Sequence, residues 1–359
     1  MQALRERIEN FIYPHLEKYL TIAYKGGADA EVFGVKLSDG NFSEGALVFS
    51  SAILYVHYEK NGDARAESAL KRLNYFLELA TKSPCLTWAK LSILRAYAIL
   101  LDAGLLDKID STHIDAIKEK TDYGDFVDKQ KGMLIKASSN YLQVAMACAG
   151  IRVRLGWETD EVFQRIKASF KKIVSSSAFD FWTDEEPPYG RFDRYSFLLS
   201  SEISDNFFLM DQPMPEWAQK NLTLAAEYAL FAANSKGDGY NYGRSLSTHG
   251  DSAMAEVLSA ALARGFVKEK DRPLAVAYIG AIVEKLLSFW YRDEIESFDI
   301  WWNGRSTNKY RQVQRVFEVN LDMCLHLYTV LLSLVRADVA NEMPDFSLIS
   351  APRYWQAKE

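Results

Sequence analysis

Residues 141–173 read YLQVAMACAGIRVRLGWETDEVFQRIKASFKKI, and this stretch decides the fold class. Apolar residues recur at helical spacing over 141–155 and again over 162–173, so each part is expected to form an amphipathic helix. Between them, Gly156-Trp157-Glu158-Thr159 offers a glycine that can end the first helix and a threonine that can cap the second. The stretch therefore predicts two helices joined by a short polar turn.

The same spacing of apolar residues continues along most of the chain, while strand patterns are nearly absent. The further helical stretches are 4–12, 47–56, 70–77, 91–101, 195–209, 222–231, 254–262, 276–290 and 313–335, with a weaker one at 109–117. About twelve helices of ordinary length are expected from this pattern. The sequence thus predicts an all-α protein.

Two kinds of connection alternate between these helices. Short polar turns occur at 61–63 and 156–159, whereas the long connections, rich in aromatic and polar residues, are 25–44, 175–193, 234–247 and 292–310. This alternation favours a double ring of paired inner and outer helices, with the long loops gathered at one mouth. A helical solenoid is the alternative, but it normally shows a sequence signature at a fixed period, which is not found here. With no linker-like segment, residues 1–359 are expected to form a single domain.

Composition restricts the classes of partner. The 359 residues are 48% hydrophobic and 25% charged, with a formal net charge of −6, and no run of Lys and Arg forms a basic stripe. Nucleic acid is therefore not expected as a partner, because binding it requires such a stripe. The three cysteines, Cys85, Cys148 and Cys324, lie far apart among apolar residues, as expected for buried thiols in a reducing compartment.

The first twenty residues and the apolar stretches bear on location. Residues 1–20 are amphipathic and contain acids, unlike a secretory signal, and no stretch is expected to span a membrane. We therefore expect a cytoplasmic protein without a membrane partner. A carbohydrate enzyme in that compartment would act on imported oligosaccharides.

The first polar segment, 189–205, follows a turn built from prolines and a glycine. Asp193 can cap the next helix, on which Glu202 and Asp205 are three residues apart and share a face. Glycoside hydrolysis needs one carboxylic acid and one carboxylate at the scissile bond, so these three acids are candidate catalytic residues. A cap and a surface ion pair are the structural alternatives. Candidate substrate-binding residues here are Tyr189, Arg191, Arg194 and Tyr195.

The second polar segment, 240–251, contains glycines that allow tight turns before an apolar helix. Tyr242, Arg244 and Asp251 are candidate substrate-binding residues, and His249 could act as a general base or hold a sugar hydroxyl. Hydrogen bonding of His249 to a neighbouring serine is the structural alternative. His326, by contrast, sits inside an apolar helical pattern. With no second histidine or cysteine at ligand spacing, neither a metal nor another cofactor is expected.

A third stretch combines aromatic and basic residues. Trp301 and Trp302 can stack on the apolar faces of pyranose rings, and Arg305 can bind a uronate carboxylate through its forked N–H groups. Burial of the tryptophans in the core is the alternative. If the ring forms, the polar residues of all three segments should converge on one pocket.

Four motifs carry a resemblance to a known family. These are Glu44-Gly45 after Phe42, Asn140-Tyr141 at a helix start, Asp193-Arg194-Tyr195, and above all Tyr242-Gly243-Arg244-Ser245-Leu246. In order and spacing the chain resembles a bacterial family catalogued as domain of unknown function 2264. That resemblance implies an (α/α)6 toroid related to glucuronyl hydrolases and polysaccharide lyases, and adds Glu44, Asn140 and Tyr141 to the candidate substrate-binding residues. Residues 247–251 depart from the family pattern, which has aromatic and basic residues there.

The related toroids imply two chemistries. In a hydrolase, Asp193, Glu202 or Asp205 would supply acid and base while Arg244 and Tyr242 hold a uronate-like sugar. In a lyase, a tyrosine or His249 would abstract the proton beside the uronate carboxylate, which Asn140 or Arg244 would neutralise. Because the chain is acidic, hydrolysis of a small oligosaccharide is favoured. A non-catalytic sugar-binding or scaffold protein is the third possibility, since fold does not imply function.

Overall fold

The computed structural model describes residues 2–39, 43–135, 140–176, 194–240, 248–298 and 309–350. Twelve α-helices lie within these ranges. They are α1 Leu4–Gly26, α2 Ser43–Lys60, α3 Ala66–Lys82, α4 Thr87–Asp102, α5 Ile114–Lys120, α6 Asn140–Arg154, α7 Asp160–Ser176, α8 Arg194–Leu209, α9 Glu216–Phe231, α10 Thr248–Ala263, α11 Arg272–Lys285 and α12 Lys309–Arg336.

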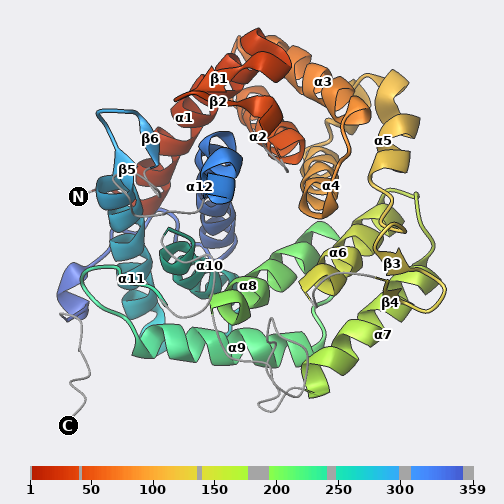
Figure 1. Cartoon of the computed structure of the whole chain (residues 1–359). Helices are drawn as coiled ribbons and strands as arrows, with labels where there is room; N and C mark the ends of the chain where they lie inside the picture. The colour runs from red at the N-terminus through yellow and green to blue at the C-terminus, as the bar shows by residue number, and fades with distance from the viewer. Residues whose placement is uncertain are drawn as a thin grey trace.

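The helices form two concentric rings, with the even-numbered helices inside and the odd-numbered helices outside (Figure 1). Each inner helix contacts the next, from α2 through α4, α6, α8 and α10 to α12, and α12 contacts α2, so the inner ring is closed. The chain is therefore an (α/α)6 toroid. The predicted all-α double ring of about twelve helices is confirmed.

The inner and outer helices differ in how their apolar residues are distributed. Every residue of α10 from Thr248 to Leu262 is buried, as expected for a helix enclosed on all sides. In the outer helix α3, the buried residues form one stripe, including Leu73, Phe76 and Leu77, and the rest of the helix faces solvent. An outer helix thus covers an inner one through a single apolar face.

The alternation of long and short connections follows from this arrangement. Each predicted long connection leads from an outer to an inner helix, namely α1 to α2, α7 to α8, α9 to α10 and α11 to α12. The short turns instead follow the inner helices α2 and α6. Because consecutive helices run in opposite directions, all inner helices begin at the same end of the ring, which we call the mouth.

Three short hairpins lie in connections on the mouth side. They are β1 Glu31–Val32 with β2 Val35–Lys36, β3 Val127–Asp128 with β4 Met133–Leu134, and β5 Tyr291–Arg292 with β6 Ser297–Phe298, each pair antiparallel. All three precede an inner helix, so they add structure only to the loops that lead into the ring.

One glycine sets the distance between two inner helices. A Cβ atom added at Gly45 of α2 would lie 2.5 Å from the Cα and 2.7 Å from the carbonyl oxygen of Ala89 in α4. Backbone atoms cannot move aside as a flexible side chain can, so Gly45→Ala should push α2 and α4 apart. We expect a loss of roughly 1–3 kcal/mol in the free energy of unfolding, measured by urea denaturation.

Gly124→Ala is the matched control for this prediction. Its added Cβ would meet the carboxylate of Asp122 at 3.0 Å, a side chain that can rotate away. We expect that variant to stay within about 0.5 kcal/mol of the parent, as is usual for surface changes. Equal losses in both variants would contradict the close-packing argument for Gly45.

Two stretches of the described chain are long and apolar enough to cross a membrane by length and composition, contrary to the expectation from the sequence. They are Glu269–Trp290, of 22 residues, and Val319–Arg336, of 18 residues. Within the ring, 61% and 67% of their respective apolar windows are buried. α11 and α12 therefore have a structural reason to be apolar, because they are packed against α10 and, for α12, also against α1.

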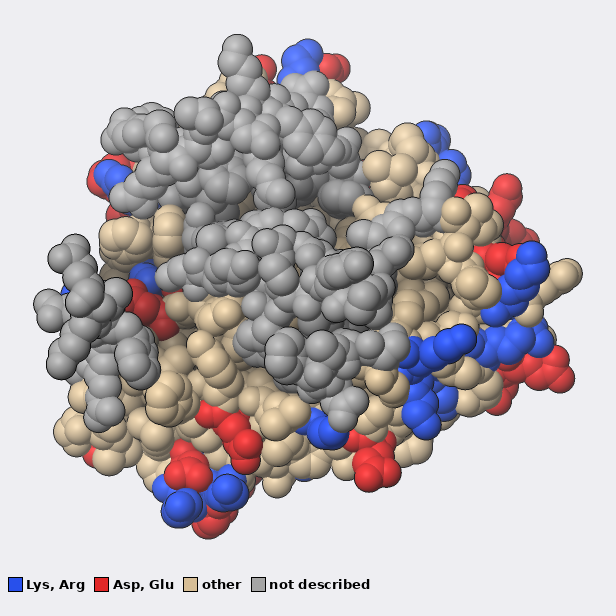
Figure 2. All heavy atoms as spheres, turned by 60° about the horizontal axis from the view of Figure 1, so that its bottom comes forward, with Lys and Arg blue, Asp and Glu red and all other residues tan. Residues whose placement is uncertain are grey.

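On the described part of the face in Figure 2, a group of basic side chains lies at the right, with acidic side chains beside it. The thiols fit the expectation from composition. Cys85, Cys148 and Cys324 are all buried and form no disulfide. Burial raises the pKa of the Cys85 and Cys148 thiols to about 12, which keeps both in the protonated form.

The ring closes where α1 meets α12 and the segment after it. The Arg5 N–H donates to the Ala340 carbonyl at 2.8 Å. Nε2 of buried His15 lies 3.0 Å from Oδ1 of Asn320, a pair separated by 305 residues in the chain. Asn320 Oδ1 also accepts the Phe298 N–H at 3.0 Å, which ties β6 to the same junction. We call this contact between α1 and α12 the seam.

Candidate functional site

A polar layer crosses the middle of the inner ring. Arg95 of α4 donates from Nε and Nη2 to Asn206 Oδ1 of α8, at 3.1 and 3.0 Å, and its Nη2 lies 3.8 Å from Glu202 Oε2. On the other side, Ser333 Oγ of α12 donates to Asp205 Oδ1 of α8 at 3.5 Å. α4 and α8 flank α6, and α8 and α12 flank α10, so these contacts join inner helices that are not consecutive in the ring.

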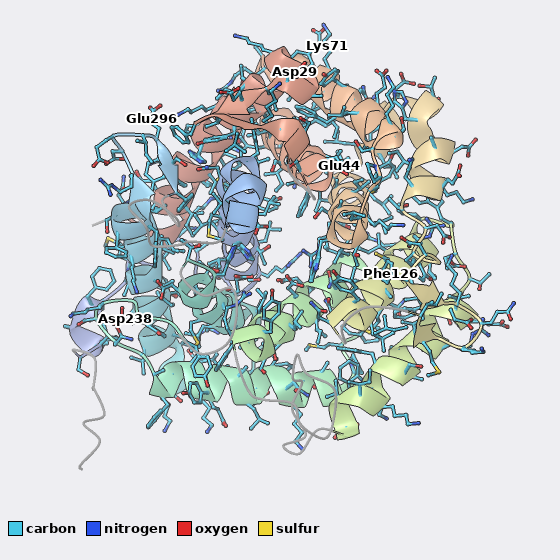
Figure 3. The ribbon with its side chains drawn as sticks, viewed as in Figure 1. Asp29, Glu44, Lys71, Phe126, Asp238 and Glu296 are labelled. Atoms are coloured by element: carbon cyan, nitrogen blue, oxygen red, sulfur yellow. The ribbon has the colours of Figure 1, made fainter. Side chains whose placement is uncertain are left out.

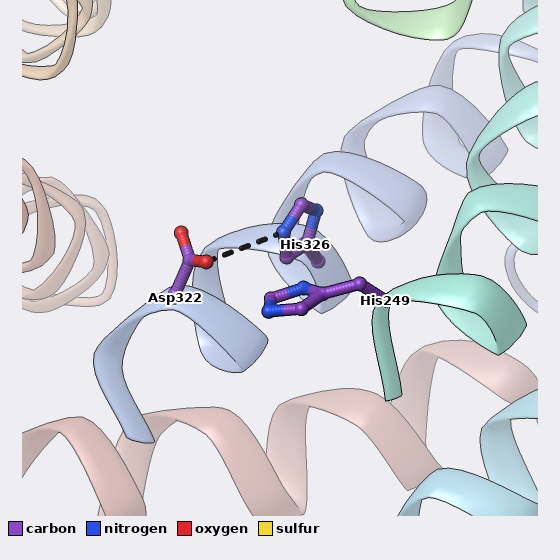
Figure 4. Close-up of side chains that lie close together, drawn as sticks. All are labelled: His249, Asp322 and His326. Atoms are coloured by element: carbon purple, nitrogen blue, oxygen red, sulfur yellow. Dashed lines mark ion pairs between the residues drawn. The ribbon is translucent and has the colours of Figure 1, made fainter. Parts of the chain in front are cut away.

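A second group of polar side chains lies beside this layer. His326 of α12 places Nδ1 2.9 Å from Glu256 Oε1 of α10 and Nε2 3.6 Å from Asp322 Oδ2. The His249 ring of α10 has its centroid 5.5 Å from that of His326 (Figure 4). We call these four residues the histidine–carboxylate cluster. The Glu256 side chain is 2% exposed, whereas that of Asp322 is 41% exposed, so the cluster runs from the core to solvent.

The helix spacings explain why these side chains meet. His249 and Glu256 are seven residues apart on α10, and Asp322 and His326 are four apart on α12, so each pair shares one helix face. α10 and α12 are neighbours in the inner ring, and their facing sides bring the two pairs together.

Burial and neighbouring charges shift the pKa values of Glu202 and His326. Burial raises the pKa of Glu202, with Arg95 acting to lower it and Glu256 to raise it further. For His326, burial lowers the pKa, but Glu256 and Asp322 outweigh burial and the pKa is raised well above its usual value. A buried carboxyl with a raised pKa therefore lies near a histidine paired with two carboxylates. Separation of protonation states among neighbouring groups is typical of acid–base sites.

Asp205 lies deeper in the ring than Glu202. Three residues further along α8 place it about 4.5 Å further from the mouth. Beyond it, the Arg264 and Arg336 guanidiniums both lie over the Phe208 ring, 3.4 and 4.2 Å from its centroid. Asp205 therefore lies on the side of the polar layer that is further from the mouth, together with Ser333.

The position of Asp205 predicts how stability depends on pH. Burial raises the pKa of Asp205 to about 7, although Arg336 and Arg95 act to lower it. The folded state therefore keeps a proton that the unfolded chain loses near pH 4, so stability should fall as pH rises from about 4 to about 7. Asp205→Asn should remove this contribution, which is on the order of 4 kcal/mol.

Urea denaturation tests this expectation. The free energy of unfolding of the parent and of Asp205→Asn is measured at several pH values between about 4.5 and 7.5. The parent should lose more stability over that range than the variant. Asp115→Asn, at an exposed position of α5, should retain the pH dependence of the parent. Parallel curves for the parent and Asp205→Asn would contradict the raised pKa.

The structure places five other predicted residues, Glu44, Asn140, Tyr141, Arg194 and Tyr195, at the mouth end of inner helices. Asn140 begins α6, Arg194 begins α8 and stacks on the Tyr195 ring at 4.1 Å, and both Asn140 and Arg194 are buried. Glu44 lies in the first turn of α2, where burial raises its pKa (Figure 3). Tyr141 follows Asn140 on α6 and has its ring 6.0 Å from that of Phe126, so it packs against the β3–β4 connection.

Asp251 occupies a position that the sequence did not predict. Its Oδ1 accepts the Gly239 N–H at 2.7 Å, its Oδ2 accepts the Trp290 Nε1–H at 2.7 Å, and Lys285 Nζ lies 2.9 Å away. Because Lys285 belongs to the outer helix α11, the carboxylate points away from the ring interior. These contacts give Asp251 a structural role, because they anchor the connection before α10, while its role in substrate binding stays a prediction.

The remaining predicted residues lie outside the described ranges. These are Asp193, Tyr189, Arg191, Tyr242, Arg244, Trp301, Trp302 and Arg305. Their segments lead directly into α8, α10 and α12, the three inner helices that carry Glu202, His249 and His326.

Sequence reasoning missed Arg95, Glu256, Asp322 and His326. The sequence marks such residues in one way: a charged or ionisable residue stands alone inside a helix that is otherwise apolar on all sides, as Glu256 does. Such a residue must be paired when buried, and its partner comes from another helix. The sequence has no second histidine at ligand spacing from His249, and spacing alone could not indicate a partner from another helix. The ring brings His326 to His249, and one nitrogen or oxygen atom each of His249, Asp322 and His326 lie within 4.8 Å of one another.

Several solved structures share this fold. Two are described as possible members of the GH105 family. The one from Salmonella enterica serovar Paratyphi A has a TM-score of 0.55 and 12% identity, and covers 90% of this chain and 94% of that chain. The one from Klebsiella pneumoniae has a TM-score of 0.56 and 15% identity, over 90% and 93%. A mutant unsaturated glucuronyl hydrolase from Streptococcus agalactiae has a TM-score of 0.53 and 12% identity, over 92% of each chain. No family model matches the chain, and no curated protein matches its sequence.

Proposed function

We propose that this protein is a glycoside hydrolase that acts on a small, uronate-containing oligosaccharide by carboxyl acid–base catalysis inside the ring. The observation that carries the proposal is the position of Glu202. It is a buried carboxyl with a raised pKa on the inner face of α8, close to Arg95 and to the carboxylates of the histidine–carboxylate cluster.

Glu202 is the proposed general acid. Protonation of the leaving-group oxygen requires a carboxyl that still holds its proton at neutral pH, and burial raises the pKa of Glu202 in the direction that this role needs. The Arg95 guanidinium, 3.8 Å from the carboxyl, is placed to stabilise the carboxylate that remains after the proton is given up. Glu202 then recovers a proton for the next turnover.

Asp322 is the proposed carboxylate partner. Among the acids of the cluster it has the exposed side chain, so it can reach a water molecule or the anomeric carbon. His326 Nε2, 3.6 Å from Oδ2, orients the carboxylate. Glu256 in turn fixes His326 from the buried side.

The substrate class is supported by the fold and by the mouth. One protein with the same fold is described as an unsaturated glucuronyl hydrolase. Arg194 begins α8 at the mouth, and the N-termini of all inner helices point the same way, an arrangement that favours an anionic group. An unsaturated or saturated uronate at the end of a short oligosaccharide is therefore the proposed substrate, and the cytoplasm the proposed location.

Incubation with unsaturated and saturated uronate disaccharides tests the proposal. The reaction is monitored through the absorbance of the 4,5-double bond and through the release of monosaccharide. Loss of absorbance or released monosaccharide is the expected result. New absorbance from a saturated substrate would identify a lyase and overturn the proposed reaction. No change with a broad panel of glycans would favour a non-catalytic sugar-binding or scaffold protein.

A further inference from the structure

A candidate set of metal ligands lies within the histidine–carboxylate cluster (Figure 4). One atom each of His249, Asp322 and His326, two imidazole nitrogens and one carboxylate oxygen, lie within 4.8 Å of one another. The side chains come from two neighbouring inner helices, α10 and α12, so the ring itself fixes their approach. We propose that these three side chains bind a divalent transition-metal ion of the zinc type.

The contact between Glu256 and His326 is an independent indication of such a site. A histidine that binds a metal through one ring nitrogen typically donates the N–H of the other to a carboxylate, which fixes the tautomer and the ring orientation. Here Nδ1 of His326 lies 2.9 Å from Oε1 of Glu256, whose side chain is 2% exposed. This leaves Nε2 of His326 on the side of Asp322, where the ion would be bound.

The types of ligand select the class of ion. Two imidazoles with one carboxylate suit zinc and similar transition ions, whereas magnesium and calcium prefer oxygen ligands throughout. The carboxylates of Asp322 and Glu256 supply two negative charges to balance a divalent ion. Three protein ligands leave a fourth tetrahedral position open, as in catalytic zinc sites. Because Asp322 is 41% exposed, that position faces solvent in the ring.

The open position suggests what the ion would do, an argument that rests on the proposed function. The ring interior carries the carboxylates of Glu256 and Asp322, which together would repel a uronate. A divalent ion with one free position can bind a uronate carboxylate or a sugar hydroxyl directly. The ion would thus let an acidic interior accept an anionic sugar close to Glu202.

Titration calorimetry of the full, metal-free chain with ZnCl₂, and separately with MgCl₂, tests the site without any substrate. We expect one zinc ion per chain and no binding of magnesium at the same concentrations. His249→Ala and Asp322→Ala should each weaken zinc binding by about 100-fold or more, and Glu256→Gln by about 10- to 100-fold. His113→Ala, which removes an imidazole at the N-cap of α5, should keep the affinity of the parent.

Absence of zinc binding by the parent at micromolar concentrations would overturn the proposal. Unchanged affinity in both His249→Ala and Asp322→Ala would do the same. Circular dichroism melting of each variant verifies that it is folded, and Asp322→Ala, at a partly exposed side chain, keeps the test decisive if the buried variants unfold. Since zinc binding is measured without sugar, its failure is distinct from a failure of the proposed hydrolase activity.

Discussion

Glu202→Gln should reduce kcat for a uronate disaccharide by roughly 10²- to 10⁴-fold, the range that general acid catalysis contributes. Glutamine has the shape of a protonated glutamate but cannot give up a proton to the leaving group. Because burial already raises the pKa of Glu202, the neutral side chain is the form that the fold accommodates. The melting temperature should therefore change little while activity is lost.

Asp205→Asn is the closest comparison for that variant. It removes another buried carboxyl from α8, three residues further along and next to Ser333 instead of Arg95. We expect its effect on kcat to be at least about tenfold smaller than that of Glu202→Gln, since it lies further from the mouth. Glu227→Gln, at an exposed side chain of α9, should have the activity of the parent. Full activity in Glu202→Gln would remove Glu202 from the mechanism.

Asp251→Ala should cost about 3–5 kcal/mol in the free energy of unfolding, as breaking one side of a buried ion pair typically does. The substitution removes the acceptor for Gly239 and Trp290 and one of two carboxylates that neutralise Lys285. Urea denaturation of the parent and the variant measures the loss. The loss should occur without sugar present, because the carboxylate faces α11 and not the ring interior.

Asp238→Ala provides the matched control for that prediction. Asp238 Oδ1 lies 2.7 Å from the same Lys285 ammonium, but its side chain is 35% exposed, against 1% for Asp251. We expect a loss of about 1 kcal/mol or less, as for other solvent-exposed pairs. If Asp251→Ala retained stability but lost affinity for sugar, the substrate-binding role predicted from the sequence would be supported.

The double ring could be predicted because it depends on local pattern. Helical spacing fixes each helix, and the alternation of short and long connections indicates which helices pair directly. The hairpins were not predicted, since two-residue strands such as Glu31–Val32 carry too few residues to show alternation. The apolar character of α11 and α12 reflects enclosure by other helices, which is a property of the assembled ring.

The site could be predicted only in part. Glu202 and His249 were visible because each stands in or beside a segment rich in polar residues. His326 and Glu256 are hidden in apolar helices, and only the ring brings them within 2.9 Å of each other. Asp251 shows another limit of the sequence. A one-dimensional pattern does not tell which face of a helix turns outward, and Asp251, only two positions after His249, contacts Lys285 of the outer helix α11.

The seam between α1 and α12 has a consequence for how the chain folds. Most helix pairs of the ring come from adjacent segments, whereas the His15–Asn320 contact closes a loop of 305 residues. For a flexible chain, closing such a loop costs about 2 kcal/mol more in entropy than closing one of twenty residues. The helical hairpins can therefore form first as an open, curved array whose two ends meet last. Any error in curvature along the array accumulates at those ends, so closure requires every preceding helix pair to be packed correctly.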